Sequence, residues 1–293
     1  AARHWLRAGR RSVEQSANAE AIAHLEAGLR ALADAEPCAE RAQLELLLQT
    51  ELGMPSIAVH GYAAPKTWQC WERARSLAHS LNEREHLARA SYGLWAANAS
   101  KGQMRDALAM AESVLDVARQ LADTGMQVVG QRVRGLTRLL MGDLPAADAD
   151  LAAMLAAYDP AAHRDLGFRF GQNPRVAAHA VQGLLRCLQG RDAEALACRT
   201  ASFAEAAELR HANSMAYAYA YGGCIPALVR GDVPEVERVS ALLIEVSTRH
   251  GMALWHAYGQ LGRGWLLAQA AKDASQAAEG AAVMAAALDA CAA

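Results

Sequence analysis

The stretch "KGQMRDALAMAESVLDVARQ", residues 101–120, decides the fold of this chain. Counted from Ala107, small or apolar residues recur at offsets 0, 1, 4, 7, 8 and 11, which is the spacing of one helical face. The glycine and the polar residues before this pattern suit a turn that closes one helix and begins the next. The stretch therefore predicts an amphipathic helix that the chain enters through a tight turn.

The same spacing recurs along the whole chain. Its starting positions are Ala21, Cys70, Ala107, Ala147, Ala195, Glu235 and Ala277, with one polar exception at Ala147 and at Glu235 and only a partial fit at Ala195. Another helical segment lies between each pattern and the next, which gives seven helix–turn–helix units and roughly fourteen helices. One such unit cannot bury its own apolar face, so the units must stack on one another. The repeat predicts a right-handed α-α superhelix, a tetratricopeptide-like solenoid of about seven helical hairpins.

Composition supports an all-α protein. The 293 residues are 53% hydrophobic but only 5% aromatic, so alanine and leucine carry the burial. Alanine is the best helix former, and its small side chain lets helices approach closely. The segment "AYAYAY", residues 216–221, alternates like a strand, yet Tyr217 and Tyr221 lie four apart on one helix face, and we predict helix there. We expect residues 1–293 to form a single repeat domain.

Charge and cysteine usage exclude several classes of protein. A net charge of −2 argues against a general nucleic-acid binder, which usually carries a strongly basic face. No run of about 18 uncharged apolar residues predicts a membrane span, and the start has no signal-peptide pattern. Six cysteines without CxxC spacing indicate reduced thiols in a cytoplasmic protein.

Two insertions lengthen the repeat. "GMPSIAVHGYAAPKTW", residues 53–68, joins the two helices of one hairpin. "YDPAAHRDLGFRFGQNPR", residues 158–175, lies between the second helix of one hairpin and the first helix of the next. We expect the second insertion to be a structural joint. Its alternative role is the rim of a binding groove, made by His163, Arg164, Gln172, Asn173 and Arg175.

The first helices of such hairpins usually line the concave surface on which partners bind. They carry polar and aromatic residues at helical spacing, namely Gln131, Arg134, Arg138, His179, Gln182, Arg186, Tyr217, Tyr221, His256, Gln260 and Arg263, with Asn213 continuing the row. Any soluble helix needs a polar face, so a solvated surface explains the pattern equally. The functional interpretation is a groove for an extended or helical partner segment, whose carboxylates the arginines pair.

Motifs for self-contained catalysis are missing from the sequence. There is no GxxxxGK[ST], HExxH, GxSxG or EF-hand pattern, and no two histidines lie four apart. We therefore predict no catalytic residue, no metal site and no cofactor. The tryptophans at helix positions are interpreted as core, and the arginines of the first helix (Arg3, Arg7, Arg10 and Arg11) as a solvated or neighbour-contacting face.

Four segments carry a resemblance to a known family: "HWLRAGRRSVEQSANAEAIAHLEAGLRAL" (residues 4–32), "GYAAP" (61–65), "YDPAAHRDLGFRFGQNPRV" (158–176) and "HGMALWHAYGQLGRGWLLAQ" (250–269). They resemble the tetratricopeptide-like C-terminal region of large bacterial signalling ATPases. In that family a class III adenylate/guanylate cyclase domain, or a DNA-binding domain, precedes an AAA-type ATPase and then the repeats. The family pattern near residue 173 has Asp where this chain has Asn173, which leaves open any role that needs a carboxylate there.

The resemblance implies that the chain is a fragment of a larger multidomain protein. It further implies a non-catalytic sensor and interaction module, which binds a protein or a small effector and regulates an upstream ATPase/cyclase in signal transduction. The main alternative is a free-standing scaffold that binds peptide or protein partners. A remote alternative, an α/α-toroid enzyme, would need paired carboxylates facing into a closed ring, whereas the polar row here is basic and amide-rich.

Overall fold

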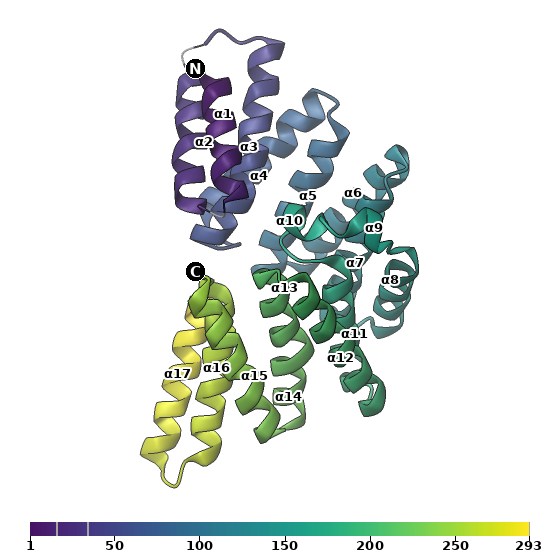
Figure 1. Ribbon diagram of the computed structural model, residues 1–293, viewed down its shortest axis with the longest axis vertical. Helices are drawn as coiled ribbons and strands as arrows, with labels where there is room; N and C mark the ends of the chain where they lie inside the picture. Colours follow the sequence, from purple (N-terminus) through teal and green to yellow (C-terminus); the bar gives the residue numbers. More distant parts are fainter. Residues whose placement is uncertain (16, 34, 293) are drawn as a thin grey trace. The chain divides into compact units, whose positions relative to one another are not determined.

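The computed structural model describes residues 1–15, 17–33 and 35–292, and within these ranges the chain forms helices and turns and no strand (Figure 1). The predicted all-α class is confirmed. Because the sequence is rich in alanine and poor in β-branched runs, helix is the conformation that its composition favours.

Seven pairs of consecutive helices make up most of the described chain. They are α1 (Ala2–Glu14) with α2 (Asn18–Ala33), α3 (Ala39–His60) with α4 (Pro65–Ser80), α5 (Arg84–Ser100) with α6 (Met104–Leu121), α7 (Thr124–Leu140) with α8 (Leu144–Ala157), α11 (Pro174–Leu188) with α12 (Asp192–Leu209), the composite α13 (Ala212–Tyr217), η1 (Ala218–Cys224) and α14 (Ile225–Arg230) with α15 (Val233–Arg249), and α16 (Ala253–Ala270) with α17 (Ala274–Ala292). Between the fourth and fifth pairs lie the short helices α9 (Pro160–His163) and α10 (Leu166–Phe170).

The repeated spacing predicts the second helix of every pair. Each of the seven predicted starts lies in one of the helices α2, α4, α6, α8, α12, α15 and α17. Three of the alanine starts, Ala21, Ala107 and Ala147, are completely buried. A methyl group at these positions lets the neighbouring helix approach closely, so the pattern marks where each pair packs.

The turns inside the pairs follow the predicted chemistry. Gly142 and Gly231 have φ angles of 86° and 67°, in the left-handed region that favours glycine after the end of a helix. The following Asp143 and Asp232 each accept a hydrogen bond at 3.2 Å from the backbone N–H three residues on. These two aspartates therefore cap α8 and α15 at their N-termini.

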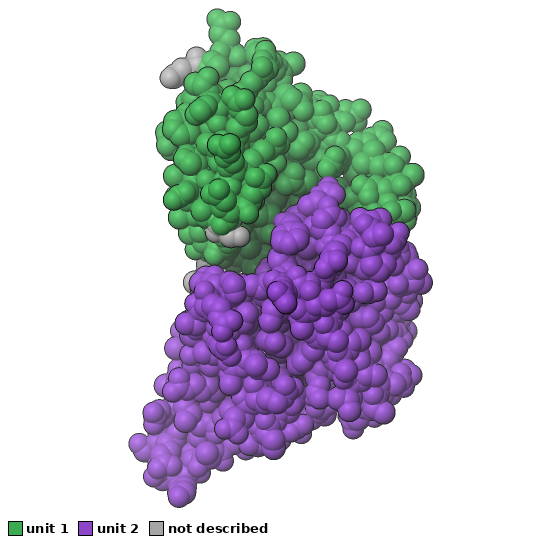
Figure 2. All heavy atoms as spheres, viewed as in Figure 1, with its two compact units in different colours: residues 1–137 green, residues 138–293 purple. Residues whose placement is uncertain are grey.

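The chain divides into two compact units, Ala1–Thr137 and Arg138–Ala293 (Figure 2). The boundary falls inside α7 rather than in a linker. The single repeat domain expected from the sequence stays a prediction, and the two units are described separately below.

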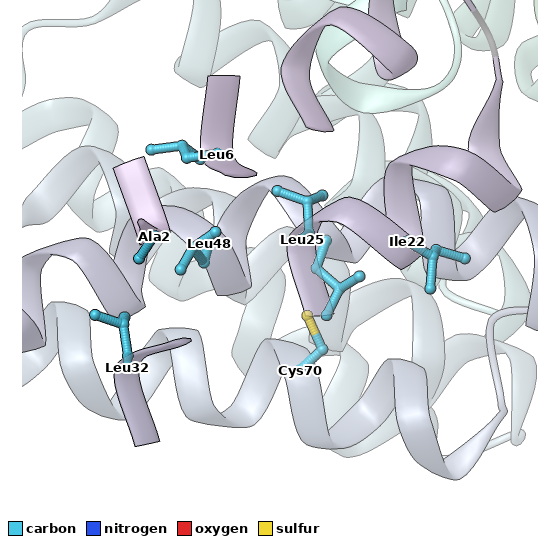
Figure 3. Close-up of a cluster of buried hydrophobic side chains, with 8 residues drawn as sticks. Ala2, Leu6, Ile22, Leu25, Leu32, Leu48 and Cys70 are labelled. Atoms are coloured by element: carbon cyan, nitrogen blue, oxygen red, sulfur yellow. The ribbon is translucent and has the colours of Figure 1, made fainter. Parts of the chain in front are cut away.

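The core of unit 1 begins at its first three helices. Leu6, Leu25 and Leu48, from α1, α2 and α3, pack into one buried cluster that Cys70 of α4 extends (Figure 3). Leu25 and Leu48 are fully buried. Each helix thus buries its apolar face against the next one, as stacked repeat units require.

In unit 2, α16 and α17 approach each other through glycines. A Cβ at Gly264 would lie 2.9 Å from the carbonyl oxygen of Gly280 and 2.9 Å from the backbone nitrogen of Met284. No side chain fits between backbones this close, so glycine is required at this crossing.

The 158–175 insertion is an ordered joint. Asn173 caps α11 by accepting hydrogen bonds from the N–H groups of Arg175 and Val176 at 3.0 and 3.2 Å, and its amide donates to the Tyr158 hydroxyl at 2.9 Å. Its own backbone N–H donates to the Ser214 hydroxyl at 2.8 Å. One buried residue therefore ties the end of α8 to the starts of α11 and α13, through its side chain and its backbone N–H.

Two segments differ in detail from what the sequence shows. Most of the 53–68 segment is not a loop, because α3 continues through Pro55 to His60 and the connection to α4 spans only residues 61–64. The "AYAYAY" segment is helical as predicted, but from Ala218 it changes to the wider π form of η1. Gly222 and Gly223 lie in this turn, where a Cβ on Gly223 would come within 3.0 Å of Phe203 and Val239.

Candidate functional site

The predicted polar residues on α11 contact side chains of the neighbouring second helices, α8 and α12. Arg186 donates two hydrogen bonds to the Asp148 carboxylate of α8, at 2.7 and 2.9 Å, and Gln182 donates to the same carboxylate at 3.4 Å. Burial raises the pKa of Asp148, but the hydrogen bonds from Arg186 and Gln182 outweigh it and lower the pKa overall. The N–H donors that the sequence assigns to a partner's carboxylates are thus engaged with a carboxylate of this chain.

The rows on α7 and α16 have similar surroundings. Arg138 donates to the buried Asp150 of α8 at 2.9 Å. His256 lies 3.2 Å from the Thr248 hydroxyl of α15, and its other ring nitrogen lies 3.0 Å from the amide of Gln260. The other three predicted residues on these helices differ in exposure: Gln131 and Arg134 are half-buried, and Arg263 is exposed.

His179 is the third predicted residue on α11. It is half-buried, and its Nδ1 has no hydrogen-bond partner in the described chain. Burial, and then the positive charge of Arg175, lower the pKa of this imidazole. His179 is therefore neutral near pH 7.

Tyr217 and Tyr221 do not continue this polar row. Their rings stack at 4.6 Å between centroids, and Tyr217 meets the ring of Trp255 edge-on at 5.7 Å. At about 100° of rotation per residue, Trp255 and Tyr258 lie about 150° around α16 from His256 and Gln260. The predicted surface is therefore two surfaces on nearly opposite sides of α16.

The insertion residues are mostly interior. His163, Gln172 and Asn173 are 3%, 4% and 1% exposed, so they offer no surface to a partner. Arg175 pairs with Glu205 of α12 at 2.6 Å and stacks over Tyr158. Arg164 is the one exposed member of the predicted rim. These contacts favour the joint over the groove rim.

An aromatic cluster on successive first helices is the candidate site of unit 2. We name Tyr217, Tyr221, Trp255 and Tyr258 the tyrosine face. Tyr221 and Tyr258 are half-buried and have rings 6.2 Å apart, while Tyr217 and Trp255 lie beneath them, 4% and 5% exposed. Amphipathic rings with an apolar body and a polar tip are the side chains that protein-binding surfaces favour.

Hydrogen bonds orient Trp255 in the tyrosine face. The Trp255 indole N–H donates to the Asn213 side-chain oxygen, and the Asn213 amide donates to the carbonyl oxygen of Gly171 at 2.6 Å. The π-turn η1 follows Tyr217 directly, and such turns are frequent at functional sites. The rings are therefore preorganised on rigid helices.

Sequence reasoning found only half of this cluster. Trp255 was assigned to the core, and Tyr258 was not singled out. The length of the repeat could have indicated Tyr258. Neighbouring patterns in this part of the chain start 40 residues (195 to 235) and 42 residues (235 to 277) apart, and Tyr258 follows Tyr217 by 41 residues, at the equivalent position of the next unit.

Unit 1 carries a second aromatic pair on a first helix. Tyr92 and Trp95 of α5 are buried, and their rings lie 5.5 Å apart. The guanidinium of Arg132, on α7, lies 5.8 and 5.4 Å from these two rings. The Trp95 indole N–H donates to the Thr137 hydroxyl at 2.8 Å, which fixes the ring.

A groove lies on the other side of α16 from the tyrosine face. Its volume is about 710 Å³, and small apolar residues of α17 form one wall. His256 and Gln260 of α16 and Ser247 and Thr248 of α15 also line it.

The described residues also bear on other chemistry. Among them, no helix is long and apolar enough to cross a membrane, and no cluster of three potential metal ligands occurs. Burial raises the pKa of the Cys70 thiol to about 12, so this cysteine is unreactive.

Comparisons with known proteins show the fold. No family model and no curated protein matches the sequence. The solved structure of the apo form of RapI matches with a TM-score of 0.68 and 11% identity, over 99% of this chain and 98% of RapI. A Rap protein complexed with competence and sporulation factor matches with a TM-score of 0.58 and 14% identity, over 94% of this chain and 74% of that one. The chain thus shares the α-α superhelical, tetratricopeptide-like fold of these Rap proteins.

Proposed function

We propose that this chain is a helical-repeat scaffold that binds a peptide segment of a partner on the tyrosine face. The observation that carries the proposal is the cluster of four rings on two successive first helices, two of them only half-buried. Stacked helical repeats bind partners along extended surfaces of this kind, and aromatic anchors supply most of the binding free energy.

The shared fold supports a peptide as the partner. One of the similar solved structures is a Rap protein complexed with competence and sporulation factor, and the likeness covers nearly all of this chain. At 14% identity the likeness carries the fold alone, so the ligand class is our extension from that protein to this one.

The predicted polar row contributes less to this proposal. Arg138 and Arg186 already pair with Asp150 and Asp148, so a partner carboxylate would have to displace an internal one. Exchanging one such pair for another releases little free energy. We therefore place the site on the rings rather than on the arginines.

The experiment is a selection from a random heptapeptide library on the immobilised protein, followed by calorimetric titration of the recovered peptide. Tyr221→Ala should weaken binding of that peptide by at least about tenfold, as truncation of an aromatic anchor does. Arg186→Lys, on the polar row, is the control and should leave the affinity unchanged. Recovery of no peptide, or equal affinities for the Tyr221 variant and the wild type, would refute the proposal.

A finer proposal comes from the family resemblance in the sequence. Partner binding on these repeats would bias an ATPase or cyclase in the same polypeptide between two states, which requires a different affinity for each state. In this proposal catalysis belongs to those domains and not to the repeats. Reading the complete gene tests for such domains. If they are present, deletion of the repeats should change the response of their activity to the selected peptide, and an unchanged response would count against regulation.

A further inference from the structure

Arg132 is an exception among the arginines of the described chain. Only Arg132 and Arg186 are buried there, 1% and 9% exposed. Arg186 is paired with the Asp148 carboxylate by two hydrogen bonds. Arg132 has no carboxylate partner, and its Nε and Nη1 atoms are buried without any hydrogen bond among the described residues.

The interactions that Arg132 does make are neutral. Its Nη2 donates to the Tyr92 hydroxyl at 3.2 Å, and the guanidinium lies near the rings of Tyr92 and Trp95. A guanidinium has five N–H donors and stays charged in proteins. Ring contacts attract the cation but do not replace the hydrogen bonds that its N–H groups lose on leaving water.

Hydrogen bonds orient one of the rings beside Arg132. Trp95 is held through its indole N–H by Thr137, whose hydroxyl donates to the Val133 carbonyl at 2.8 Å. Burial raises the pKa of the Tyr92 phenol in spite of the nearby Arg132, so Tyr92 is neutral and does not supply the missing charge. Among the described residues the arginine is therefore a buried donor without an anion.

We propose that Arg132 binds a peptide carboxylate, either a C-terminus or an Asp or Glu side chain, as a contact of unit 1. The inference rests on the proposed function only in taking a peptide as the ligand, and it does not involve the tyrosine face of unit 2. A carboxylate brings one negative charge, which matches the one unpaired positive charge, and two oxygens that fit the edge of the guanidinium fork whose N–H groups are not donated to Tyr92. Because Arg132 is covered, side chains must move aside to admit the ligand, and association should be slow.

The test compares three random heptapeptide libraries on the immobilised protein. The first has free C-termini and no Asp or Glu, the second has amidated C-termini and includes Asp and Glu, and the third has no carboxylate at all. The wild type should retain the first or the second at least about tenfold better than the third, and the preferred library identifies which carboxylate is bound.

Arg132→Met is the decisive variant, since methionine fills the space between the rings without charge. It should retain the three libraries equally. The matched control is Arg105→Met, which removes an exposed arginine of α6 in the same unit and should leave the wild-type preference intact. Equal retention of the libraries by the wild type, or an unchanged preference in Arg132→Met, would overturn the inference.

Stability gives an independent readout. Replacing a buried unpaired charge by an apolar side chain of similar length removes a desolvation penalty, so Arg132→Met should fold and unfold at a higher Tm than the wild type. A lower Tm would mean that the charge is already compensated within the fold, which contradicts the proposal. If the wild type retains peptides but shows no preference for carboxylates, the inference about Arg132 is wrong and the proposed scaffold function is not affected. If it retains no peptide, both are wrong.

Discussion

The close crossing of α16 and α17 makes Gly264→Ala a demanding test of the packing in unit 2. The added methyl group would meet Gly280 oxygen and Met284 nitrogen at 2.9 Å each, and Met284 Cγ at 2.8 Å. Two of these three atoms belong to the backbone, so a change of rotamer relieves only one contact. Overpacking of this kind costs about 1–3 kcal/mol, and alanine returns up to about 1 kcal/mol of helix propensity.

We expect Gly264→Ala to lower the free energy of unfolding by about 2 kcal/mol and to loosen α17, most of which is exposed on its other side. Urea unfolding followed by circular dichroism measures the first effect, and amide hydrogen exchange of residues 274–292 measures the second. Gly251→Ala is the matched control: its φ is 63° and no atom lies within 4 Å of the added methyl group. It should cost only the backbone strain of about 1 kcal/mol and leave exchange in α17 unchanged.

A second mutation separates backbone from side-chain contact. Met284→Ala removes the contact with Cγ but leaves both backbone atoms in place. The double mutant Gly264→Ala with Met284→Ala should therefore remain destabilised and show only partial relief, because residues in contact couple by about 0.5 kcal/mol or more. Wild-type stability in Gly264→Ala, or full rescue by Met284→Ala, would refute the geometry of this crossing.

Three further changes test local contacts. Asp148→Asn should lower stability by about 1–3 kcal/mol, because it leaves Arg186 only the more exposed Glu194, at 3.4 Å, as a counter-charge. Since the pKa of Asp148 is lowered in the folded chain, the wild type should lose this contribution as pH falls below about 4, while the variant should not. Asn173→Ala should cost about 2 kcal/mol in urea unfolding, through the lost cap and the lost bond to Tyr158, and no change would contradict the joint. Burial lowers the pKa of His179, so protonation of this residue opposes folding. Stability should therefore fall as the pH drops below about 6.5, and His179→Gln should reduce that fall. An identical pH profile of stability in the variant and the wild type would contradict this prediction.

The repeat was predictable because it depends on residues that are close together in the sequence. Ala107 and the apolar residues that follow it at helical spacing mark one face of one helix, and that face is buried in the structure. The turn chemistry at Gly142 and Asp143 is equally local. Both rest on short-range rules, so they needed no knowledge of which helices meet.

The candidate site was less predictable because it depends on long-range partners. A helical pattern shows that Arg186 lies on a polar face, but not that Asp148, 38 residues earlier, neutralises it. The glycines of η1 lie against Phe203 and Val239, which come from other helices and which no local pattern contains. The tyrosine face likewise required knowing that consecutive first helices bring Tyr217 and Trp255 together.

Two residues on α16 test most directly where the partner binds. Tyr258 lies on the tyrosine face and His256 on the nearly opposite side, although only two positions separate them in sequence. The measurement is the Kd of the library-selected peptide for Tyr258→Ala and for His256→Ala, by calorimetric titration. We predict a loss of at least about tenfold for Tyr258→Ala and wild-type affinity for His256→Ala. The reverse ranking would place the partner on the polar row and contradict the account.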